Sequence, residues 1–97
     1  MSLRVRLKAG AASDLAEAMA WYDAEQFGLG NEFPNAVDDT LRRVAAHPLL
    51  YRECRPGVRL AVLKRFPYLV FFVLDPEEIV VLACLHSRCN PRRWLKS

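Results

Sequence analysis

The sequence predicts a small α+β domain, strand-helix-helix-strand-strand-strand, with a helical hairpin packed on one face of a mostly antiparallel four-stranded sheet. Three observations predict this fold class. Residues 3–8 alternate apolar and basic side chains, as a half-buried strand does. Residues 11–44 carry apolar side chains at three- and four-residue spacing, which marks two helices. The later apolar runs, at 58–66, 68–74 and 79–85, are separated by turn residues and predict an antiparallel meander.

A glycine-rich junction separates the two predicted helices. The first runs from Ala11 to about Phe27, and its acidic residues Asp14 and Glu17 lie early, where the helix dipole favours acids. Gly28-Leu29-Gly30 ends this helix, because glycine tolerates the left-handed conformation of helix ends. Asn31 is predicted to cap the second helix, which His47-Pro48 ends. The predicted buried positions are Leu15, Ala18, Met19 and Tyr22 in the first helix and Phe33, Val37, Leu41 and Val44 in the second.

Length and composition indicate a single globular domain spanning residues 1–97. Three cysteines at irregular spacing and two histidines do not form a metal motif, so we expect free thiols in a reducing cytosol and neither metal nor organic cofactor. No apolar run approaches the ~18 residues of a spanning helix, and no leader peptide is evident. We therefore expect a cytoplasmic protein without a membrane partner.

The net charge of +3 is unevenly distributed along the chain. Residues 1–51 carry five Lys/Arg against seven Asp/Glu, whereas residues 52–97 carry nine against four. The basic second half favours an acidic or polyanionic partner. The runs at 68–74 and 79–85 are apolar on both faces of a strand, although helices can cover only one. Either the second face binds a partner, or a strongly curved sheet is filled by Trp94 and the tail.

Several short motifs, taken in order, resemble the RelE/ParE family of bacterial toxins. The resemblance covers nearly the whole chain and depends on the joint spacing of the motifs. They are Asp14-Leu15, Trp21-Tyr22, Gly28-Leu29-Gly30 with Phe33, His47-Pro48, Phe66-Pro67-Tyr68, Leu85-His86, and Pro91-Arg92-Arg93-Trp94. The resemblance implies a growth-inhibiting toxin that is neutralised by an acidic antitoxin encoded beside it. The C-terminal segment of such an antitoxin wraps the toxin. The expected antitoxin-binding residues are Arg59, Arg65, Tyr68 and Phe72.

The resemblance leaves the target open between two branches of the family. RelE-like members cut ribosome-bound mRNA, and the catalytic candidates for that chemistry here are His86, Arg65 and Arg88. Nuclease members tend to carry an arginine just ahead of the third strand, where this sequence has Tyr68. The set is therefore incomplete, which favours a ParE-like inhibitor of DNA gyrase. The expected target-binding residues are Arg88, Arg92, Arg93 and Trp94. A third hypothesis is a non-toxic relic that retains only partner binding.

Overall fold

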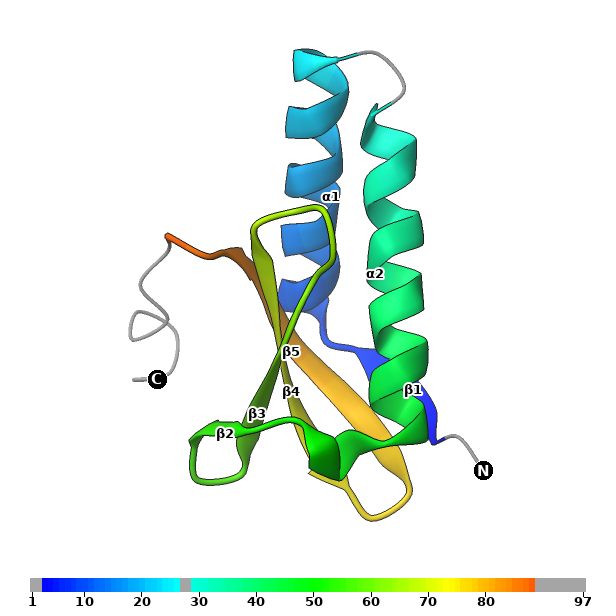
Figure 1. Ribbon diagram of the computed structural model, residues 1–97, viewed down its shortest axis with the longest axis vertical. Coiled ribbons are helices and arrows are strands. Elements are labelled where there is room, and N and C mark those ends of the chain that lie inside the picture. Colours follow the sequence, from blue (N-terminus) through cyan, green and yellow to red (C-terminus); the bar gives the residue numbers. More distant parts are fainter. Residues whose placement is uncertain (1–2, 27–28, 89–97) are drawn as a thin grey trace.

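A computed structural model describes residues 3–26 and 29–88 of the chain. Two long helices lie side by side against one face of a twisted sheet (Figure 1). The α+β class and the helical hairpin on the sheet are thus confirmed. The elements follow one another as β1 (Arg4–Leu7), α1 (Ala9–Glu25), α2 (Leu29–Ala46), the 3-10 helix η1 (Pro48–Leu50), β2 (Glu53–Arg55), β3 (Val58–Val62), β4 (Tyr68–Asp75) and β5 (Glu78–His86).

The sheet has five strands in the order β1-β5-β4-β3-β2, one more than the sequence predicted. The additional strand, β2, pairs with β3 across the turn at Pro56-Gly57. It has only three residues, too few to show the apolar–polar alternation from which a strand is predicted. Strands β3 to β5 form the expected antiparallel meander, and β2 extends it by one antiparallel strand. The first strand, β1, is parallel to the last, with Arg4 opposite Glu78 and Leu7 opposite Val81.

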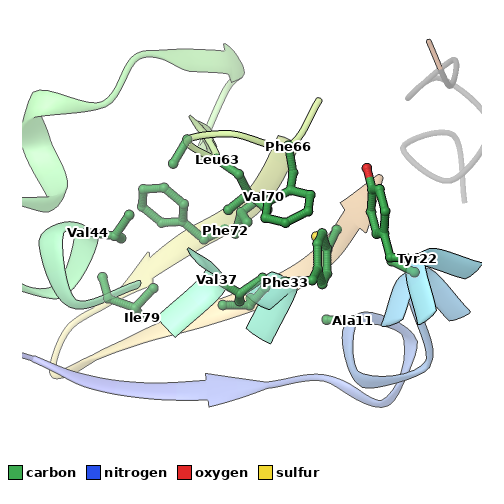
Figure 2. Packing of buried hydrophobic residues seen from close by; sticks show 14 residues of the cluster. Ala11, Tyr22, Phe33, Val37, Val44, Leu63, Phe66, Val70, Phe72 and Ile79 are labelled. Carbon is green, nitrogen blue, oxygen red and sulfur yellow. The ribbon is translucent and has the colours of Figure 1, made fainter. Parts of the chain in front are cut away.

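The hydrophobic core lies between the helical hairpin and the sheet (Figure 2). Both predicted helix stripes are confirmed: Phe33 and Val44 have no exposed surface, and Leu15, Met19 and Leu41 pack around the buried residues. Asp38 and Asp39 face solvent, where they pair with Arg42 and Arg43 one turn later. An aromatic cluster closes one end of the core, with ring centroids of Tyr22, Phe33, Phe66 and Tyr68 lying 4.9 to 5.9 Å apart.

Two expectations about the helix ends were wrong. Helix α2 begins at Leu29, so Asn31 lies inside it and is not its N-cap. Asp14 is beyond the first turn of α1 and does not act through the helix dipole there. Its Oδ2 instead accepts a hydrogen bond from the backbone N–H of Cys84 at 3.0 Å. This bond holds α1 against the edge of β5 beyond the end of β1, where β5 has no neighbouring strand on that side.

The second face of the sheet, away from the helices, is apolar but only partly exposed. Its strand positions alternate with those of the core, and in register across the strands they are Val58, Leu60 and Val62, then Leu69, Phe71 and Val73, then Val80, Ala83 and Leu85. Val62 is 62% exposed, whereas Phe71 is 1% exposed. The face is therefore exposed at Val62, half-buried at Val58, Leu60 and Leu69, and buried at its centre.

Candidate partner-binding site

The ends of β4 and β5 and the loop between β3 and β4 bring several of the predicted residues into one region. Tyr68 and His86 are directly opposite in the strand register, with ring centroids 5.3 Å apart in an edge-to-face arrangement. The Ser87 N–H donates to the Pro67 carbonyl at 2.7 Å, which ties the end of β5 to this loop. Lys64, Arg65 and Arg88 are exposed here. The region is a basic surface beside aromatic rings.

His86, predicted as a candidate catalytic residue, forms a hydrogen bond with the backbone two residues later. Its Nδ1 accepts a hydrogen bond from the backbone N–H of Arg88 at 3.1 Å. A neutral imidazole that accepts at Nδ1 carries its proton on Nε2, so the ring can still donate from that nitrogen. Arg88 contacts His86 through its backbone N–H, and the side chain of Arg88 stays exposed.

Arg65 is held by α2 rather than by His86. Its Nη2 lies 2.6 Å from Oε1 of Glu32, and its guanidinium carbon lies 5.9 Å from the centroid of the Phe66 ring. The backbone of Arg65 has φ 74, the left-handed region that side-chain-bearing residues rarely adopt. Such a conformation costs of order 1–2 kcal/mol and is kept only where neighbours enforce it. The structure thus fixes where Arg65 points, and that direction is toward the start of α2.

The predicted antitoxin-binding residues do not share one surface. Phe72 has no exposed surface and packs beneath the helices, so the prediction that it contacts a partner was wrong. Because neighbouring residues of a strand point to opposite faces, Phe71 takes the second face instead. Tyr68 is half-buried in the aromatic cluster. Arg59 is half-buried, and its guanidinium donates to the Tyr51 carbonyl at 2.5 Å and lies 3.5 Å from Glu53.

A depression of about 260 Å³ lies between α1 and the end of β5. It was not predicted from the sequence. Asp14, Glu17 and Trp21 of α1 line one side of it, and Tyr68 and His86 line the other. Burial, and to a lesser extent the nearby Glu17 charge, raise the pKa of Asp14, while the hydrogen bond from Cys84 opposes them. Trp21 is 56% exposed, its ring edge-on to Tyr22. The Trp21-Tyr22 pair was noticed in the sequence, but its position beside His86 required the fold.

Of the predicted target-binding residues, Arg92, Arg93 and Trp94 lie outside the described residues. Within the described ranges, no group of three or more His, Cys, Asp or Glu side chains is placed to hold a metal ion. No helix in the same ranges is both long and apolar enough to cross a membrane. Cys54 and Cys84 are free thiols, and burial raises the pKa of Cys84 to about 12, so this thiol stays protonated at neutral pH.

The described residues thus form a small domain in which a helical hairpin packs on a five-stranded sheet. Two solved structures are similar to the chain. A structure of the chromosomal ParDE toxin-antitoxin system from P. aeruginosa has a TM-score of 0.77 at 18% identity and covers 88% of this chain and 96% of its own. The toxin-antitoxin complex RelBE2 from Mycobacterium tuberculosis has a TM-score of 0.64 at 18% identity and covers 89% and 99%. At this identity the likeness shows the fold.

The sequence itself assigns the family. The profile described as ParE toxin of type II toxin-antitoxin system, parDE, matches residues 5–91. The chain therefore belongs to the ParE toxin family of type II toxin-antitoxin systems, as its motifs suggested. No curated protein sequence matches it.

Proposed function

We propose that this ParE-family toxin inhibits DNA gyrase when free and is neutralised by an acidic antitoxin in the cytoplasm. We choose gyrase over mRNA as the target because the candidate catalytic residues make other contacts. His86 uses its Nδ1 on a backbone N–H, and Arg65 is paired with Glu32. Strand β4 contains no basic residue, and its first residue is Tyr68, whose ring belongs to the aromatic cluster. These contacts favour inhibition by binding over RNA cleavage.

The proposed antitoxin surface is the second face of the sheet together with the basic region beside it. An amphipathic segment of the antitoxin would cover the apolar residues along β3, where Val62 is the most exposed, and the neighbouring Leu69. Its acidic side chains would approach the exposed Arg65 in the loop that follows β3. In the strand register Arg59 and Tyr68 lie on the helix side of the sheet, as Phe72 does, so a further part of the antitoxin would have to reach them. An acidic partner matches the basic second half of the sequence in charge, which favours fast and selective association.

The proposed gyrase-binding residues are Arg88, Arg92, Arg93 and Trp94. An aromatic side chain among arginines has the composition of an interface hot spot. Their test is the inhibition of DNA supercoiling by purified gyrase, measured with the triple variant R92A/R93A/W94A. We expect the concentration needed for half inhibition to rise at least about tenfold, equivalent to about 1.4 kcal/mol of binding energy. The matched control is Arg52→Ala, which removes an exposed arginine remote from the tail in sequence and should inhibit as the wild type does.

Expression without the antitoxin distinguishes the three hypotheses. Gyrase inhibition predicts growth arrest with filamentation and induction of the DNA-damage response. Translation arrest without DNA damage, with primer extension showing cuts in ribosome-bound mRNA that His86→Ala abolishes, would replace the proposal with RNA cleavage. Unchanged growth with the toxin present at normal levels would indicate a protein that retains only partner binding.

A further inference from the structure

The depression between α1 and the end of β5 combines negative charge with aromatic surface. Of the described residues that line it, Asp14 and Glu17 are acidic and none is lysine or arginine. Within the described ranges, neither carboxyl group forms an ion pair. Burial raises the pKa of Asp14, and the nearby charge of Glu17 raises it further. A cation bound between the two side chains would therefore favour the ionised form of Asp14.

Aromatic rings line much of the remaining depression. Trp21 follows Glu17 by four positions in α1, which places both on one face of the helix. The Trp21 side chain is 56% exposed, and Tyr68 lies on the opposite side of the depression. The Nδ1 of His86 accepts a hydrogen bond, so this ring is neutral and adds no positive charge. A planar cation can lie against such rings while carboxylates accept hydrogen bonds from its edge.

The size of the depression suits a single arginine side chain. Its volume of about 260 Å³ is below the roughly 300–1,000 Å³ of pockets that enclose drug-sized ligands. Ala18 and Leu85 offer apolar surface to the stem of the arginine, and the carboxyl groups accept from its guanidinium. A phosphate or an acidic side chain would be repelled. An apolar side chain would remove water from the carboxyl groups without replacing its hydrogen bonds.

We propose that this depression binds an arginine side chain of gyrase. The identity of the partner rests on the proposed function, whereas the preference for a cation follows from the lining. Arg88, the first of the proposed gyrase-binding residues, follows His86 by two positions, so the depression adjoins that contact. An acidic antitoxin is the less suitable occupant, because Asp14 and Glu17 repel its charge. A contact that pairs charges of both signs selects one orientation of the toxin on its target.

The site itself is tested with blocked arginine, N-acetyl-arginine-amide, added to the purified toxin and followed by NMR. We expect the indole N–H signal of Trp21, identified by its loss in Trp21→Phe, to shift together with the backbone amide of Glu17. Blocked citrulline has the same shape without the charge and should bind at least about tenfold more weakly, a difference of about 1.4 kcal/mol. Equal binding of the two compounds, or no shift at Trp21, would overturn the proposal.

Two variants with the same loss of charge separate the depression from the net charge of the protein. Glu17→Gln should weaken the binding of blocked arginine about two- to fivefold, the range of an exposed ion pair. Glu25→Gln is the matched control, because Glu25 is exposed on α1 and does not line the depression, and it should bind as the wild type does. Equal effects of the two variants would contradict the proposed site.

Inhibition of DNA supercoiling by purified gyrase tests the identity of the partner. Glu17→Lys places a cation in the depression, and we expect the concentration needed for half inhibition to rise at least about tenfold. Glu25→Lys makes the same change of charge elsewhere on α1 and should inhibit as the wild type does. Normal inhibition by Glu17→Lys would exclude gyrase as the partner at this site. A wild type without effect on gyrase would refute the proposed function, and this failure is distinguishable because the arginine titration needs no gyrase.

Discussion

The hydrogen bond from the Cys84 N–H to Asp14 provides the most direct test of how α1 is attached to the sheet. Cys84 is 2% exposed, and Asp14→Ala would leave its N–H without this acceptor. An unsatisfied buried donor costs about 1–3 kcal/mol. That is a substantial part of the roughly 5–15 kcal/mol that stabilises a domain of this size. Asp14→Asn keeps an acceptor oxygen at the same place and should lose less.

The pH dependence of this effect follows from the raised pKa of Asp14. The folded protein binds this proton more tightly than the unfolded chain, whose carboxyl has the ordinary pKa of 3.8. The resulting stabilisation is complete below 3.8 and is lost as pH rises through the folded-state pKa. The difference in free energy of unfolding between the wild type and Asp14→Ala should therefore be larger at pH 3 than at pH 7.

Urea unfolding followed by circular dichroism at both pH values measures these differences. Ser13→Ala, an exposed change on the same helix, is the control and should stay within about 0.5 kcal/mol of the wild type. The reasoning is refuted if Asp14→Ala is as stable as Asp14→Asn at pH 7. It is also refuted if the stability difference from the wild type does not decrease between pH 3 and pH 7.

The remaining predictions concern burial, the strained loop and the exposed ion pair. Phe72→Ala should lower the free energy of unfolding by about 3–5 kcal/mol because its ring is wholly buried, whereas Val62→Ala should change it by less than about 0.5 kcal/mol in the same urea titration. Equal effects would contradict the burial of Phe72 and the exposure of Val62. Arg65→Val should be less stable than Arg65→Gly by about 1–3 kcal/mol, because a β-branched residue tolerates a φ of 74 poorly. If thermal unfolding ranks the two variants the other way, this backbone conformation is excluded. Glu32→Gln should cost at most about 1 kcal/mol, an effect that 1 M salt removes, since its pair with Arg65 is exposed; a larger, salt-independent loss would mean that Glu32 has another role.

The sequence predicted the elements with strong periodicity and missed features that depend on tertiary structure. The stripes of α1 and α2 were predictable because burial of one helix face imposes a period on the sequence. The two apolar strands were predictable because each is a continuous apolar run bounded by turn residues. Strand β2 was missed because three residues cannot display a period. The parallel placement of β1 beside β5 was also not predictable, since it pairs residues as distant as Arg4 and Glu78.

The candidate site was less predictable than the fold for a related reason. A strand that is apolar on both faces does not show which residues point to the helices, and Phe72 was therefore assigned to the wrong side. His86 and Arg65 were grouped from the sequence as candidate catalytic residues. In the structure each is bonded to a different neighbour, Arg88 and Glu32, and neither bond has a signature in the sequence.

The pairing of β1 with β5 has a consequence for synthesis of the chain. The ribosome releases β1 and both helices well before β5, so the first strand has no partner during most of translation. Contacts between segments so distant in sequence also slow folding after release. Once it is made, β4 carries apolar side chains that the finished molecule buries. The unfinished chain would thus be prone to aggregate until β5 pairs with β1 and β4.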